Sequence, residues 1–182
     1  MKTFAAFLNL LTLLAVVLLS GCSGVSSKSP DVSETIRKNL DQAGLKEVTV
    51  SEDVDKGVLT LGGHVGYDAD KAQAESIAKS SAGSQVVANE IGVVPPGIDD
   101  DARKANSDLD KGIEKNLEAA FILAKLNQDV NCDVKNGVVK LTGEVSSETK
   151  RKLAESIASK VPNVQQVVNE LDVRNRKATS TP

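Results

Sequence analysis

The chain has few of the residue types that build chemical sites. Its 182 residues include no Trp, one Tyr, three Phe, one His and two Cys. Proteins that hold nucleic-acid bases or sugars by ring stacking need several aromatic side chains, so the composition argues against these classes. A single His (His64) without a Cys or carboxylate cluster at ligand spacing makes no zinc site. No nucleophile elbow, phosphate-binding loop or paired-carboxylate motif occurs, so we predict no enzyme activity and no bound metal.

The charge balance argues against general nucleic-acid affinity. The formal net charge at pH 7 is −3. Without residues 1–21, which include Lys2, twenty-one basic side chains face twenty-five acidic ones, a net charge of −4. Binding to nucleic-acid phosphates needs a basic surface that releases counterions.

The first residues predict export. Lys2 precedes an apolar run from Phe4 to Leu19 that is too short and wrongly flanked for a permanent membrane-spanning helix, as in secretory signals. The run ends in Leu19-Ser20-Gly21-Cys22, which resembles the lipobox of bacterial lipoproteins. The alternative is an ordinary secretory signal with an incidental cysteine.

The lipobox resemblance implies that 1–21 is removed and that Cys22 becomes an N-acylated diacylglycerol cysteine, the only covalent group we expect. Several acyl chains anchor a protein stably, whereas one gives marginal binding. Ser23, in place of Asp, favours the outer membrane, with the protein facing the periplasm. Cys132 is then left without an intrachain disulfide partner.

One pattern is written twice, eighty residues apart. Of the thirty-seven positions in 57–93, fifteen are identical in 137–173, so the chain contains a duplicated unit. The period-2 and period-3.6 patterns predict helix, strand, strand, helix, strand in each copy. We therefore expect an α+β fold of two tandem αββαβ units. Each unit is expected to be a three-stranded mixed sheet with two helices on one face. The first two strands form an antiparallel hairpin, whereas the strand–helix–strand crossover makes the second and third strands parallel.

The expected boundaries follow from turn and capping residues. Ser33 is the expected N-cap of the first helix and Ser107 or Asp108 begins the first helix of copy two. Pro95 and Pro96 precede three aspartates, which predicts a linker. The expected segments are a flexible tether at 22–32, units at 33–94 and 107–174, a linker at 95–106 and a disordered tail at 175–182. Units of about sixty residues are marginal alone, so we expect the copies to dock or to oligomerise.

Nine residues in each copy carry a family resemblance. In copy one they are Gly57, Val58, Leu61, Gly63, Val65, Val87, Asn89, Ile91 and Val93. With the Ala-rich helix between them they resemble the BON domain; Ser81-Ala82-Gly83-Ser84 departs from the Gly-Val usual there. The resemblance implies a periplasmic or outer-membrane protein of the bacterial envelope, linked to envelope integrity, osmotic stress response and phospholipid binding.

One stretch of copy two has more apolar side chains than a two-layer core needs, namely Phe121-Ile122-Leu123-Ala124-Lys125-Leu126. We interpret this stretch as the place where copy two carries three extra residues between its first helix and first strand. Ile113 and Leu117 match Ile36 and Leu40 at an offset of seventy-seven residues, whereas the repeated pattern has an offset of eighty. An apolar spot beside lysines suits anionic phospholipid headgroups. The candidate contact residues are Lys111, Lys115, Phe121, Ile122, Leu123 and Lys125. The alternative is burial against copy one.

Six positions that could suggest a site have structural explanations. Gly63 and Gly143 are expected at a bulge or bend, and Asn89 and Asn169 are expected to bond backbone groups. Cys132 aligns with Glu52 at an offset of eighty and is read as a small, half-buried apolar residue, and His64 as an exposed strand residue.

The combined reading is a non-enzymatic, lipid-anchored envelope protein whose BON domains bind phospholipid and support outer-membrane integrity under stress. The alternative is a chaperone-like or structural adaptor that binds outer-membrane or periplasmic proteins without lipid recognition by the domains.

Overall fold

The computed structural model describes residues 31–174. The predicted signal peptide, Cys22, most of the tether and the tail at 175–182 lie outside the described residues.

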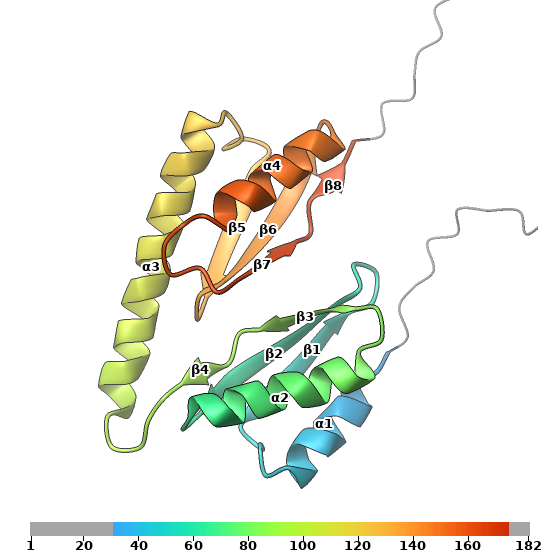
Figure 1. The fold of residues 1–182 in the computed structure, drawn as a ribbon, viewed down its shortest axis with the longest axis vertical. Helices are drawn as coiled ribbons and strands as arrows, with labels where there is room; N and C mark the ends of the chain where they lie inside the picture. Colours follow the sequence, from blue (N-terminus) through green and yellow to red (C-terminus); the bar gives the residue numbers. More distant parts are fainter. Residues whose placement is uncertain (1–30, 175–182) are drawn as a thin grey trace, which may run out of the picture.

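Copy one contains α1 (Ser33–Gln42), β1 (Val48–Asp53), β2 (Val58–Val65), α2 (Asp68–Ser81), β3 (Val86–Asn89) and β4 (Gly92–Val93). The central strand β2 pairs antiparallel with β1 and parallel with β3 and β4. Copy two repeats this order, with α3 (Asp99–Leu123), β5 (Val130–Lys135), β6 (Val138–Val145), α4 (Glu148–Ala158), β7 (Gln166–Asn169) and β8 (Asp172–Val173). The predicted α+β fold with two repeated mixed-sheet units is confirmed (Figure 1).

Each predicted third strand is interrupted by a bend. The bend in copy one carries Ile91 into the core, where it is fully buried. The Asn89 side chain accepts from the Ile91 amide (3.4 Å) and donates to the Lys71 carbonyl (3.4 Å). Asn169 makes the equivalent bonds to Leu171 and Arg151. The structural interpretation of both asparagines is therefore confirmed.

Small residues let the helices lie close to the sheets. Ala74 and Ala78 of α2, and Ala154 and Ala158 of α4, are completely buried.

Gly63 has φ +87°, and a Cβ there would stand 2.0 Å from the Glu47 carbonyl oxygen. Gly143 has the same constraint, with 2.4 Å to the Asp129 carbonyl oxygen. Close approach of the chain's own backbone explains both glycines, as expected for a tight bend.

Two helix starts differ from the prediction. The segment predicted as a linker is helical from Asp99, about two turns before Ser107. Mutual repulsion of the aspartates had argued against helix, but Asp99, Asp100 and Asp101 stand in the first turn, where carboxylates are stabilised by the free amides and the helix dipole. Ser33 is the first helical residue and not the N-cap. Instead, the Val32 and Ser33 amides donate to Glu52 Oε2 at 3.0 and 3.1 Å.

The strand register and helix ends correct the alignment of the copies. Leu45 N donates to Leu40 O, and Leu126 N donates to Phe121 O, each at 2.9 Å. Phe121 to Leu126 therefore corresponds to Leu40 to Leu45, and the interpretation as extra residues was wrong. The offset of seventy-seven was misleading because α3 begins before the position in copy two that corresponds to the start of α1.

The first strands also shift. Val50 pairs with Leu61, and Cys132 pairs with Leu141. Cys132 thus corresponds to Val50, and not to Glu52 as predicted. The hairpin of copy two is two residues shorter: it turns at Asn136-Gly137, both with positive φ, as in the type I′ turns preferred by two-residue loops.

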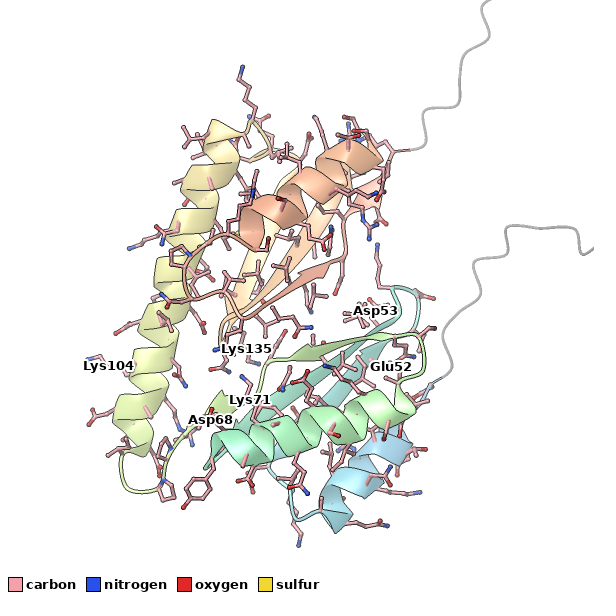
Figure 2. The ribbon with its side chains drawn as sticks, viewed as in Figure 1. Glu52, Asp53, Asp68, Lys71, Lys104 and Lys135 are labelled. Atoms are coloured by element: carbon pink, nitrogen blue, oxygen red, sulfur yellow. The ribbon has the colours of Figure 1, made fainter. Side chains whose placement is uncertain are left out.

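The two copies dock through equivalent surfaces. Docking was one of the two arrangements that we expected for such small units, and this prediction is confirmed. Val58 and Ala88 of copy one form a buried cluster with their counterparts Val138 and Val168. The hairpin of each copy reaches the other copy, through Lys56 Nζ to Asp172 Oδ2 (2.7 Å) and Asn136 Nδ2 to Glu90 O (2.8 Å). Figure 2 shows Lys135 where this second hairpin meets copy one. The contact is a pseudo-twofold interface.

Gln166 makes one contact across the interface that has no counterpart in copy one. Gln166 Nε2 donates to Val87 O (2.7 Å), and Gln166 Oε1 accepts from Asn89 N (3.2 Å). The side-chain amide of Gln166 thereby bonds the backbone carbonyl of Val87 and the backbone amide of Asn89 at the outer edge of β3. The counterpart of Gln166 is Val86, which is 47% exposed and makes no such bond.

Candidate functional site

Phe121 lies in the core of copy two. It is 2% exposed and packs with Ile113 and Leu117, which precede it at helical spacing on α3. Leu126 is also buried, at 1%. Neither sequence reading holds for Phe121, since it neither faces lipid nor lies against copy one. It occupies the place of Leu40 in copy one, and the larger ring fills the same pocket between helix and sheet.

Ile122 and Leu123 are exposed, at 52% and 86%. They end α3, and Lys125 follows at φ 57°, a left-handed conformation that closes the helix. We call Ile122, Leu123 and Lys125 the α3 tip. In Figure 1 this end of α3 points away from copy one, whereas the start of α3 lies beside it. The α3 tip is therefore not part of the interface between the copies.

The α3 tip differs in kind from the same place in copy one. The aligned residues of copy one are Asp41, Gln42 and Gly44, all exposed. Gly44 adopts φ +80°, so the backbone turn is the same. Two polar side chains and a glycine in copy one thus become two large apolar side chains and a lysine in copy two. The fold does not require this change, because copy one makes the same turn without it.

The remaining candidate lysines lie along α3. Lys115 is exposed seven residues before Ile122, on the same side of the helix by its spacing. Lys111 pairs with Asp108 at 3.1 Å and lines a cavity between the copies. The structure therefore places Lys115 nearer the α3 tip and Lys111 nearer copy one.

A cavity of about 580 Å³ lies where α3 passes both copies. His64 Nε2 and Arg103 Nη2 approach within 3.2 Å there, which makes His64 half-buried and not the exposed strand residue that we predicted. On the other side, Asp110 accepts from the Asn136 and Gly137 amides at 2.8 and 2.9 Å. Sequence reasoning missed this cavity because it exists only once the two copies dock.

A second cavity of about 340 Å³ continues along the outer edge of β5. Both cavities are lined by Glu114, and this one also by Glu118 and Cys132. Burial raises the pKa of the Cys132 thiol, and Glu114 and Glu118 raise it further. A thiol with a raised pKa is a poor nucleophile at neutral pH, which agrees with the reading of Cys132 as a half-buried apolar residue.

The pKa of the Glu75 carboxyl group is lowered by Lys79 and by the asparagine at the strand bend. Glu75 accepts a bond from Lys79 and one from Asn89 Nδ2 (2.9 Å), and both lower the pKa of Glu75. This network ties α2 to the end of β3. It is structural, because it links elements of one copy and faces neither cavity.

The comparisons with known proteins agree with this architecture. The model of the BON domain matches residues 29–95 and 109–175. The chain belongs to the BON-domain family. It is also 30% identical over 143 residues to osmotically-inducible protein Y of Escherichia coli (strain K12), an alignment that covers 74% of this chain and 67% of that protein.

Similarity to solved structures is weak. Two structures of CdsD, a structural protein of the type III secretion system of Chlamydia trachomatis, align with 78% of this chain. The sequence identities are 12% and 11%, the TM-scores 0.33 and 0.32, and the matched shares of CdsD 66% and 63%. Likeness at this level carries no functional argument.

Within residues 31–174, no helix is both long and apolar enough to cross a membrane. The same residues hold no group of three or more His, Cys, Asp or Glu side chains arranged to bind a metal ion.

Proposed function

We propose that this chain is a non-enzymatic envelope protein, anchored at the outer membrane by acyl chains on Cys22, that contacts phospholipid through the α3 tip and supports envelope integrity under osmotic stress. The observation that carries the lipid contact is the change from Asp41, Gln42 and Gly44 to Ile122, Leu123 and Lys125. Relation to osmotically-inducible protein Y supports the link to osmotic stress.

The size of the contact fits a weak, reversible association. Full burial of one large aliphatic side chain contributes about 1.5–3 kcal/mol, and Ile122 begins half-buried. Lys125 beside an anionic surface adds about 1 kcal/mol. A total of about 4–5 kcal/mol corresponds to a dissociation constant near 1 mM. The acyl chains on Cys22 would therefore provide the attachment, and the α3 tip would orient the domains on the surface.

The test exchanges the α3 tip for the residues of copy one. Vesicle co-sedimentation is measured for the chain from Ser23, which lacks the acylation site, at about 1 mM accessible anionic lipid because of the weak affinity expected. The triple variant Ile122→Asp, Leu123→Gln and Lys125→Gly should bind much less than the unchanged chain. The matched control is Tyr67→Ser, which removes a large exposed side chain (63% exposed) from copy one and should bind normally.

Salt and lipid charge give a second readout. Because Lys115 and Lys125 act through charge, binding should weaken as salt rises and on neutral vesicles. Equal binding by the triple variant and the unchanged chain would refute the lipid role of the α3 tip. The adaptor function would then be the better account, with membrane contact through Cys22 alone.

A further inference from the structure

The outer edge of β5 is an unpaired strand edge. β5 pairs only with β6, on its other side. The turn at Asn136-Gly137 makes Lys135 and Val138 a hydrogen-bonded pair, so the alternation of an antiparallel ladder directs the backbone groups of Cys132 and Val134 outward. Among the described residues no partner bonds to the Cys132 or Val134 amides. Such an edge is a template for another strand.

A groove runs along this edge. The two cavities that share Glu114 together follow β5 from Val130 to Lys135, between the strand and α3. We call it the β5 groove. Its helical side is formed by residues at positions that repeat along one face of α3, listed here in chain order: Ser107, Lys111, Glu114, Glu118 and Phe121. Figure 1 shows α3 lying beside β5 over its length.

The β5 groove is acidic at one end and is lined by more basic than acidic side chains at the other. Near Val130 stand Glu114 and Glu118, neither of which forms an ion pair with any described residue. Near Lys135 stand Arg103, whose contact is His64, and Lys111, together with the Asp110 carboxylate, which accepts from the Asn136 and Gly137 amides. Lys135 itself lies 3.6 Å from Glu90, and Lys111 3.1 Å from Asp108, so these two lysines are partly neutralised.

Copy one lacks this arrangement at the equivalent edge. Glu52 holds the start of α1 against β1 through the Val32 and Ser33 amides, but Val134 occupies its register position in β5. By the helix alignment, Glu118 corresponds to Arg37, which has the opposite charge. The acidic end of the groove is therefore particular to copy two.

We propose that the β5 groove binds an extended segment of another protein, which adds to β5 as an antiparallel strand with an acidic residue near its start and a basic residue near its end. Antiparallel pairing places the start of the segment at Lys135 and its end at Glu118. The backbone of the segment bonds to Cys132 and Val134, as in other cases of strand addition, and charge sets its direction. This inference goes beyond the proposed lipid contact and does not depend on it.

The test uses a peptide of the sequence Asp-Val-Thr-Val-Thr-Val-Lys with blocked ends and a fluorescent label, and the full chain carrying Cys22→Ser. Anisotropy should show saturable binding. The reversed peptide, Lys-Val-Thr-Val-Thr-Val-Asp, should bind about tenfold more weakly, because both end charges then oppose those of the groove. A peptide methylated on the alternate amides that face β5 should not bind measurably.

Two variants locate the contact. Glu118→Lys should weaken binding of the first peptide about fivefold and favour the reversed one. Arg37→Glu, the charge reversal at the equivalent place in copy one, should leave binding unchanged. In the chain that carries Cys22→Ser, Cys132 is the sole thiol, and bound peptide should slow its alkylation.

Several outcomes would overturn the proposal, and the first three change only the peptide, so they do not depend on the folding of a variant. They are absence of binding at millimolar peptide, equal binding of the methylated peptide, equal or tighter binding of the reversed peptide, and an equal effect of Arg37→Glu and Glu118→Lys. Loss of vesicle binding in the α3 tip variant with unchanged peptide binding would separate the two proposals.

Discussion

Replacing Lys125 by Gly should stabilise the protein and weaken its binding to lipid. Lys125 adopts φ 57°, in a region where residues with a Cβ are strained. Copy one has Gly44 at the same turn, with φ +80° and nothing within 4 Å of the place a Cβ would occupy. Backbone strain of this kind costs about 1 kcal/mol, even after allowance for the greater freedom of glycine in the unfolded chain.

The assay is urea unfolding followed by circular dichroism. A gain of about 1 kcal/mol in a domain of this size should raise the urea midpoint by about 0.5–1 M, or the melting temperature by about 4–8 °C. The reciprocal substitution Gly44→Lys in copy one should destabilise that copy by a similar amount. In vesicle co-sedimentation, Lys125→Gly should bind less anionic lipid because a cation is lost from the α3 tip.

Opposite changes in stability and binding are the signature that a residue is retained for function at a cost to the fold. An unchanged or lower urea midpoint for Lys125→Gly would show that Lys125 makes a stabilising contact in the folded protein. Lipid binding would then not be needed to explain the presence of Lys125.

Three further predictions concern the core, the interface and the response to pH. Phe121→Ala should cost about 3–5 kcal/mol of unfolding free energy in chemical denaturation, with unchanged vesicle binding by molecules that remain folded; a cost below about 1 kcal/mol would contradict its burial. Gln166→Ala removes both bonds to the edge of β3 and should speed hydrogen exchange at Asn89, without changing exchange inside α4. Glu75→Gln should reduce stability at neutral pH. Because the folded pKa of Glu75 is lowered, its contribution is present above the unfolded pKa, near 4.3, and is lost as pH falls through the folded value; a pH-independent difference between the two proteins would refute this.

The sequence was sufficient for the fold because its signals are local and repeated. Alternation in 58–65 and 138–145, and alanines at helical spacing, depend on neighbours in the chain, and the duplication gives each signal twice. Helix starts were harder. Asp99 to Asp101 both repel one another and favour a helix N-terminus, and only the path of α3 beside copy one decides between these effects.

The candidate site was predicted only in part. An apolar excess in 121–126 drew attention to this segment, and Ile122 and Leu123 are exposed in the structure. Which of its side chains face outward required the correct match of Phe121 to Leu40, which is set by the bond from Leu126 to Phe121. The β5 groove could not be predicted, because it depends on docking between copies and on the register of β5.

The most direct test of the lipid contact moves the α3 tip to copy one. In the chain from Ser23 that carries Ile122→Asp, Leu123→Gln and Lys125→Gly, the substitutions Asp41→Ile, Gln42→Leu and Gly44→Lys are added, and co-sedimentation with anionic vesicles is measured. Restored, salt-sensitive binding is predicted, because copy one presents the same exposed turn. A folded protein that still fails to bind would show that these three residues are not sufficient for contact with lipid and would contradict the account.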